Sequence, residues 1–264
     1  MDCDRIDALL DANLVSRGGK FSDEARRHLN ACPRCRDLYD WFAAGPASTG
    51  LSPALCDRIT DSLTSSLQPA RRIPPLRVTV FSMLVMCALW VAALLSVTGA
   101  AGVARMTPLQ LSGVSVLLAA GVFLLSLSLS WQMRPGSRQR FGAGRAMGVC
   151  GAGVLAGVAL LFPWQTQPGF VMVGWPCLAA GLGMAAPAAL LLWLVVRRGA
   201  PLSAGAMGAT LGATAGLLGL TVLQYRCPHQ DALHLLVWHG GVVAAAAIAG
   251  LAVAWLAQRF FSRA

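Results

Sequence analysis

Six apolar segments fill most of the chain after residue 77, and they restrict its fold more than any other feature. About 20 residues of α-helix cross the ~30 Å hydrocarbon core of a bilayer, and a helix satisfies its own backbone hydrogen bonds there. We therefore expect a six-helix transmembrane bundle over residues 78–257. The predicted spans are 78–103, 108–132, 145–163, 170–196, 201–224 and 233–257.

The acidic residues divide the chain into two parts. Ten of the eleven Asp and Glu lie at or before Asp61, and the only later one is Asp231. The whole chain is 56% hydrophobic and 12% charged, which is a poor match to a soluble enzyme. The net charge of +10 comes from arginines that flank the apolar segments, which favours membrane topology over nucleic-acid binding. We expect a polar N-terminal region at 1–67 and a membrane-embedded remainder.

The arginines between the spans predict the orientation of the bundle. Cytoplasmic loops are enriched in Lys and Arg. One side has eleven arginines and the other has two, Arg105 and Arg226. The eleven are Arg71, Arg72, Arg77, Arg134, Arg138, Arg140, Arg145, Arg197, Arg198, Arg259 and Arg263. Both termini are therefore predicted to be cytoplasmic, and the first thirty residues lack the apolar core of a secretory signal peptide.

The N-terminal region has the pattern of short helices. Apolar residues at helical spacing predict a helix over 4–16, which Gly18-Gly19 ends. Ser22-Asp23-Glu24 is a favourable start for a second helix, because Ser22 can cap free amides and the acids suit the positive end of the helix dipole. A third helix is expected from Cys35 to the break at Gly45-Pro46.

Four residues of this region have the spacing of metal ligands. His28 and Cys32 lie one helical turn apart, and Cys32-Pro-Arg-Cys35 turns the second thiol back toward the first. Cys3 is a plausible fourth ligand, brought near by the returning first helix. Zn²⁺ prefers four such N and S ligands in a tetrahedron. The alternative is a set of buried or redox-active thiols beside a helical histidine.

A fourth amphipathic helix is predicted over 51–67. Leu55, Ile59, Leu63 and Leu67 recur every four residues on one side. This stripe can pack within its own domain or against another protein. A basic linker at 68–77 leads to the first span, and a short cytoplasmic tail at 258–264 follows the last.

A second group of polar residues is predicted to gather on the outer side of the bundle. Its members are Cys177 at the start of the fourth span and Cys227, His229, Asp231, His234 and His239 between the fifth and sixth spans. His234 and His239 are five residues apart and would point about 140° apart on an α-helix, which argues against coordination by the whole group. The group is either a metal or redox sensor or a polar cap on the bundle.

Small residues dominate the third and fifth spans. The motifs are Gly144-x3-Gly148, Gly153-x3-Gly157, Gly208-x3-Gly212 and Gly212-x3-Gly216. Such glycines are typical of closely packed helices, in a compact bundle or at a homodimer seam. The middle of each span lacks an ionisable side chain, which argues against an ion pump. Cys87 and Cys150, in the inner halves of their spans, are predicted to be packing residues.

The N-terminal region resembles the zinc-binding anti-sigma domain over about residues 1–67. The resemblance is carried by Cys3, the Ser-Asp-Glu-Ala helix start, His-Leu-x2-Cys-Pro-x-Cys and the trailing Leu-Ser-Pro-Ala-Leu. It implies that Zn²⁺ is bound and that the module holds an extracytoplasmic-function (ECF) sigma factor. It also implies that Leu55, Ile59, Leu63 and Leu67 contact that partner.

The spans resemble the NrsF family of six-span membrane regulators of sigma factors, over roughly residues 78–257. The motifs are Gly174-Trp175-Pro176-Cys177, Arg197-Arg198-Gly199-Ala200-Pro201, the glycine-rich fifth span and Cys227-Pro228-His229 leading to Trp238-His239. The resemblance implies that Cys177 and Cys227 are paired sensor thiols. The separate zinc module at the front departs from the family's pattern.

Together these features predict an all-α protein with a small zinc-binding helical domain followed by a six-helix transmembrane bundle. Its predicted function is that of an inner-membrane anti-sigma factor, not an enzyme, which releases its sigma factor when the outer Cys/His residues sense a signal. The sequence shows no catalytic triad, phosphate-binding glycine loop or HExxH motif. The alternatives are a transporter or channel with a regulatory zinc domain, or a haem or redox protein that uses His229, His234 and His239.

Overall fold

The computed structural model describes residues 3, 5–6, 22–44, 53–66, 74–134, 142–165, 168–197, 199 and 203–261. The chain divides into two compact units, Met1–Ala70 and Arg71–Ala264, and every regular element described is helical. The all-helical fold class predicted from the sequence is thus confirmed. Most of the predicted helix over 4–16 lies outside the described residues, as do Leu67, most of the 68–77 linker and the last three residues of the predicted tail.

Two short helices form the ordered centre of the first unit, α2 (Asp23–Ala31) and α3 (Pro33–Ala44). The side chain of Ser22 accepts a hydrogen bond from the amide of Ala25 at 3.3 Å, as the N-cap pattern predicts. The buried side chains are Ile6, Ala25, Leu29 and Cys35. Among the described residues, Cys3, Cys32, Leu38 and Tyr39 are partly buried against this small core.

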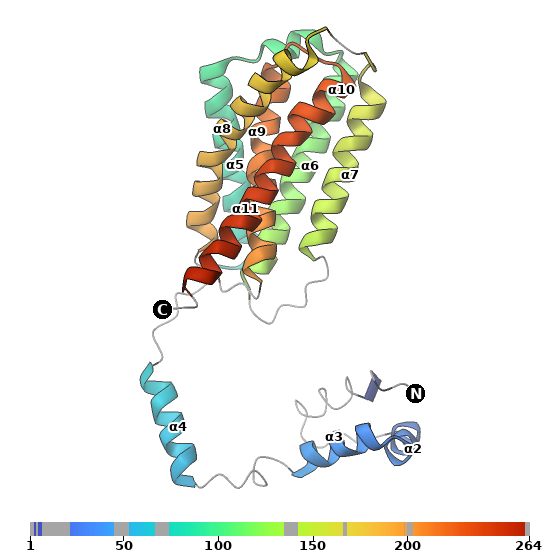
Figure 1. Ribbon diagram of the computed structural model, residues 1–264, viewed down its shortest axis with the longest axis vertical. Coiled ribbons are helices and arrows are strands. Elements are labelled where there is room, and N and C mark those ends of the chain that lie inside the picture. Colours follow the sequence, from blue (N-terminus) through green and yellow to red (C-terminus); the bar gives the residue numbers. More distant parts are fainter. Residues whose placement is uncertain are drawn as a thin grey trace. The chain divides into compact units, whose positions relative to one another are not determined.

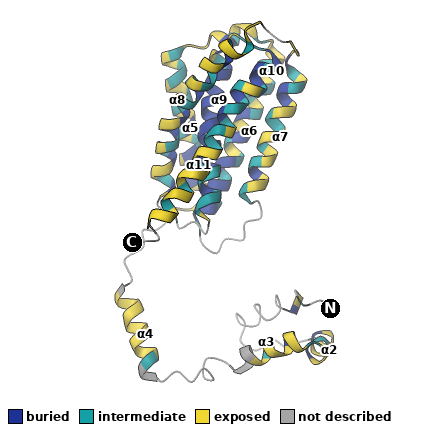
Figure 2. Cartoon of the chain, in the orientation of Figure 1, coloured by how far each residue is buried: buried dark blue, intermediate teal, exposed yellow. Residues whose placement is uncertain are grey.

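Helix α4 (Pro53–Ser66) carries the predicted apolar stripe. Ile59 is 44% exposed and Leu63 is 61% exposed, whereas Leu55 is half-buried. Most described residues of this helix are exposed in Figure 2. Two of the stripe's described residues, Ile59 and Leu63, therefore present apolar side chains to the solvent.

The second unit is a bundle of six long helices, and all six are long and apolar enough to cross a membrane (Figure 1). They are α5 (Leu76–Thr98), α6 (Pro108–Gln132), α7 (Ala143–Leu161), α8 (Phe170–Val196), α9 (Ala204–Arg226) and α11 (Gly240–Phe261), the last preceded by α10 (Ala232–His234). The first predicted span runs five residues past the end of α5, because Gly99 adopts a φ of +77° and ends the helix. A short 3₁₀ helix, η2 (Ala101–Arg105), follows.

Helix α9 forms the interior of the bundle. Sixteen of its 23 residues are buried, including every residue from Thr210 to Gln224. In Figure 2 the buried residues of α9 lie between the outer helices. The centre of the bundle is therefore filled by a helix, and no ionisable side chain occurs among those buried α9 residues.

The glycines of the fifth span explain how α11 approaches α9. A Cβ on Gly212 would lie 2.1 Å from the carbonyl oxygen of Ala246, and one on Gly208 would lie 2.4 Å from that of Gly250. Close packing at these glycines is confirmed. In the third span, a Cβ on Gly144, Gly148 or Gly153 meets no described atom within 4 Å, so these glycines do not pack against a described helix of the same chain, and a homodimer seam there stays a prediction. A spacing motif identifies a small face but not whether a helix covers it.

One end of the bundle carries η2, the loop after α9 and α10, whereas the C-terminus lies at the other end (Figure 1). A Cβ on Gly102 would lie 2.5 Å from the carbonyl oxygen of Cys227, so η2 packs directly beneath that loop. The amide of Ala232 donates to the carbonyl of Pro163 at 2.9 Å, which ties the loop to the end of α7. These contacts fix the residues between α9 and α10.

Candidate metal centres

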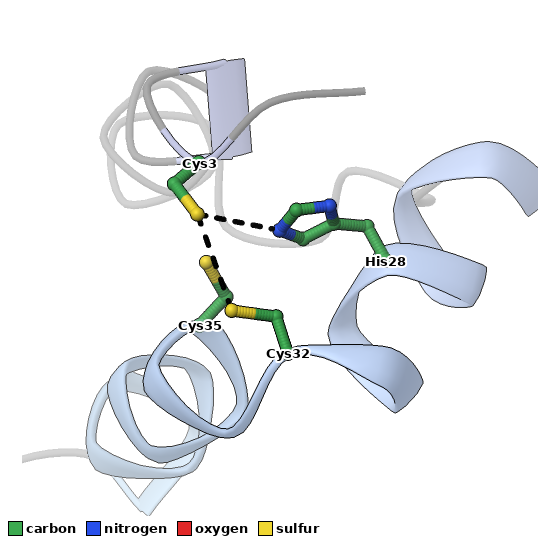
Figure 3. A group of neighbouring side chains, drawn as sticks. All are labelled: Cys3, His28, Cys32 and Cys35. Atoms are coloured by element: carbon green, nitrogen blue, oxygen red, sulfur yellow. Dashed lines mark hydrogen bonds between the residues drawn. The ribbon is translucent and has the colours of Figure 1, made fainter.

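Cys3, His28, Cys32 and Cys35 lie together in the first unit, with ligand atoms all within 4.8 Å of one another (Figure 3). The Cys3 sulfur lies 3.7 Å from His28 Nε2 and 4.0 Å from the Cys32 sulfur. With Zn–S bonds of about 2.3 Å and Zn–N bonds of about 2.0 Å, the edges of a zinc tetrahedron are about 3.5–3.8 Å. The four predicted residues thus lie at separations that fit one Zn²⁺.

The local sequence explains how α2 and α3 present these ligands. Cys32 ends α2, where its amide donates to the carbonyl of His28 at 2.9 Å, and Pro33 starts α3. Arg36 reaches back to the end of α2, where its guanidinium donates to the carbonyls of Leu29 and Asn30. This clamp fixes the turn between the second and third ligands.

The helix start and burial act in opposite directions on two of the thiols. A hydrogen bond from the backbone amide of Cys35 lowers the pKa of Cys32, which lies just before the first turn of α3. Burial raises the pKa of Cys35 to about 12. A bound cation would hold both sulfurs as thiolates.

Cys177, Cys227, His234 and His239 form a second group, whose ligand atoms also lie within 4.8 Å of one another. The two sulfurs are 3.8 Å apart, and the Cys227 sulfur lies 3.6 Å from His234 Nε2. Cys227, His234 and His239 are buried and Cys177 is half-buried. A hydrogen bond with Cys177 and burial both raise the pKa of Cys227. These separations also match the edges of a zinc tetrahedron.

A turn of π-helix, η3 (Leu235–His239), brings the two histidines together. The amide of Gly240 donates to the carbonyl of Leu235, five residues earlier, and the rings of His234 and His239 are 5.3 Å apart. The expectation that these side chains point about 140° apart is therefore wrong. It assumed α-helical geometry, whereas a π turn places residues i and i+5 one above the other.

Glycines on α8 allow Cys177 to reach this group. A Cβ on Gly174 would lie 1.9 Å from Trp238 Nε1, and one on Gly181 would lie 2.5 Å from Val242. Both glycines are within about one helical turn of Cys177. Their lack of a side chain lets α8 pack directly against the π turn and the start of α11.

The other two predicted sensor residues stand beside the cluster. The ring of His229 lies 5.5 Å from that of His234. Oδ1 of Asp231 accepts the amide of His234 at 2.8 Å and caps α10, while Oδ2 is buried with no hydrogen-bond partner among the described atoms. Gln230 donates to the carbonyl of Cys227 at 2.7 Å and so helps to hold the loop.

The fold has six helices long and apolar enough to cross a membrane, which is consistent with a multi-pass membrane protein, and it carries two Cys/His clusters that could each hold a metal ion. Residues 63–261 match the family model NrsF, "Negative regulator of sigma F". Because the match covers most of the chain, the protein belongs to the NrsF family, whose members are negative regulators of a sigma factor and not a family of enzymes. No curated protein matches the chain, and no solved structure does.

Proposed function

We propose that this protein is a membrane-bound anti-sigma factor whose N-terminal unit sequesters an ECF sigma factor in the cytoplasm. Family membership carries the proposal, because it implies a sigma factor as the partner. The matched region begins at residue 63, so Cys3, His28, Cys32 and Cys35 all precede it. The candidate ligands therefore lie outside the matched region, which includes only the end of α4 and the last residues of the N-terminal unit.

The first cluster would bind Zn²⁺ through those four residues. The donor set is three thiols and one imidazole, a usual combination for structural zinc. Zinc here would connect α2 to α3 and to the segment containing Cys3. The metal would give the small unit a fixed surface on which a partner could dock.

The sigma factor would contact the apolar stripe Leu55, Ile59, Leu63 and Leu67. Ile59 and Leu63 expose apolar side chains on α4, and Asp57 and Asp61 lie on its opposite side. An exposed apolar helix face fits the groove of a partner protein. The basic residues between residue 70 and α5 would keep this unit beside the lipid headgroups of the inner membrane.

In this proposal both termini lie in the cytoplasm, as the arginine distribution predicts, and the end of the bundle that carries α10 faces outward. A signal sensed by the Cys/His residues at that end would change the conformation of the bundle and lower the affinity of the N-terminal unit for the sigma factor. Release would then be a shift in population between two states of the protein.

The burial of α9 along most of its length favours this function over transport. A channel or carrier needs a hydrated or exchangeable route near its centre, whereas fifteen consecutive α9 residues are buried against other helices. The second cluster favours a compact ion over haem, because its four ligand atoms lie within 4.8 Å of one another.

The test is capture of purified ECF sigma factors from the same genome by the full-length chain in detergent. The variant Ile59→Glu, Leu63→Glu should weaken capture at least about 30-fold, because it places charges in an apolar contact. Asp57→Ser, Asp61→Ser alters the opposite side of α4 and should keep capture within about threefold. Equal capture by all three proteins would contradict the role of the stripe, and capture by none would contradict the proposal.

A further inference from the structure

We propose that Cys177, Cys227, His234 and His239 bind one divalent thiophilic cation of the Zn²⁺ or Cd²⁺ class. This deepens the proposed function by naming the ligand of its outward-facing site. Binding of the cation depends only on the bundle, whereas its effect on sigma-factor release depends on the proposed function as well.

The first argument is charge. Two thiolates neutralise a divalent ion, and the two imidazoles are uncharged ligands, so the occupied site has no net ligand-plus-metal charge. Three of the four ligands are buried, where an uncompensated charge is costly. A monovalent ion such as Cu⁺ would leave one negative charge. The surroundings therefore favour a divalent ion.

The second argument is the state of His239. Both of its ring nitrogens are buried and make no hydrogen bond with any described atom. Leaving buried polar groups unpaired costs about 1–3 kcal/mol each. One of its nitrogens lies within 4.8 Å of both sulfurs and of a His234 nitrogen, so an ion bound among them would satisfy it. An apolar residue would pack more favourably at this position if no ligand were bound.

The third argument is the geometry of the backbone. Gly174 and Gly181 let α8 approach, and the π turn aligns His239 with His234. Each feature departs from regular helix packing or regular hydrogen bonding, and together they bring the four ligand atoms within 4.8 Å of one another. π turns of this kind are frequent at functional sites.

The occupied site would join separate helices. Cys177 belongs to α8, Cys227 ends α9, and the histidines lie in α10 and η3. A bound ion would hold α8 against the α9–α11 pair, and loss or exchange of the ion would free α8 at this end. Half-buried Cys177 gives the ion its route of entry.

The test uses the full chain in detergent with Cys32→Ser and Cys35→Ser, so that only the bundle cluster can bind tightly. Titration with Co²⁺ alone, followed by competition with Zn²⁺ and Cd²⁺, should give about one ion per chain with a sulfur-to-cobalt charge-transfer band. Adding Cys177→Ser should remove most of this charge-transfer band. Adding His239→Gln should weaken Co²⁺ binding more than about 100-fold, because losing a ligand should cost more than losing a group that only hydrogen-bonds to a ligand.

Cys150→Ser is the matched control, because Cys150 does not belong to the cluster, and it should leave the stoichiometry unchanged. A reduced, folded chain that binds no ion, or one whose binding survives both Cys177→Ser and His239→Gln, would overturn the proposal. A Cys177–Cys227 disulfide that reforms in preference to metal binding would also overturn it. Sigma-factor capture, measured on the chain with an intact N-terminal cluster, reports separately on the proposed function.

Discussion

The two Cys/His clusters have similar ligand separations but very different structural support. In the first unit, the described core has four buried side chains, and one of them is the candidate ligand Cys35. In the bundle, packed helices surround the second cluster, and glycine contacts define the approach of α8. We therefore predict that the first unit depends on a bound metal for its fold, whereas the fold of the bundle brings the second cluster together without one.

The largest predicted effect is the unfolding of the first unit when its metal is removed. Structural zinc contributes on the order of 10 kcal/mol of apparent binding free energy, which is as large as the whole stability of many small domains. After chelation, or in Cys32→Ser, Cys35→Ser, we expect protease to digest residues 22–44 while the bundle stays intact. Mass spectrometry of the fragments measures both parts in one sample.

Cys56→Ser is the matched control, since Cys56 is exposed on α4 and belongs to neither cluster. It should retain the wild-type fragments. Protection of residues 22–44 after complete loss of metal would show that the first unit does not depend on its cluster.

A smaller effect is predicted for Gly174→Ala in the bundle. The new Cβ would overlap the ring of Trp238, and overpacking of this kind costs about 1–3 kcal/mol. We expect a lower thermal midpoint and weaker Co²⁺ binding at the second cluster. Gly183→Ala, on the same helix, meets no described atom within 4 Å and should be neutral or slightly stabilising. Equal effects of the two changes would refute the role of close approach at Gly174.

The smallest effect is predicted for Asp231→Asn. Asn caps a helix about as well as Asp, so α10 should persist. The change removes a buried carboxylate next to the cluster, and the loss of a nearby negative charge weakens the binding of a cation. We expect a decrease of about 10-fold in Co²⁺ affinity with unchanged stoichiometry. Unchanged affinity would assign Asp231 to helix capping alone.

Much of this organisation follows from sequence pattern. Apolar length predicts the spans, including α8 at 170–196, because hydrocarbon thickness and helical rise leave few alternatives. The Ser22 cap and the spacing of His28, Cys32 and Cys35 depend on contacts within a few residues. Local chemistry of this kind can be predicted without knowledge of tertiary structure.

The second cluster could be predicted only in part. Its residues can be named from the sequence, but their convergence depends on a π turn at Leu235–His239, and the local residues carry no distinct signal for it. The sequence likewise does not predict which individual glycines lie at close helix contacts. Gly212 contacts α11 closely and Gly148 meets no described atom, although each belongs to a Gly-x3-Gly pair. Tertiary packing decides between these outcomes.

The most direct test of the anti-sigma account is capture of partners by the tagged full-length chain from its own membranes, with metal analysis of the same eluate. The account predicts an ECF sigma factor in the eluate and about two metal ions per chain, one for each cluster. It also predicts that Cys32→Ser, Cys35→Ser loses the sigma factor and one of the two ions. A metal-loaded, folded chain that elutes without any sigma factor would contradict the account.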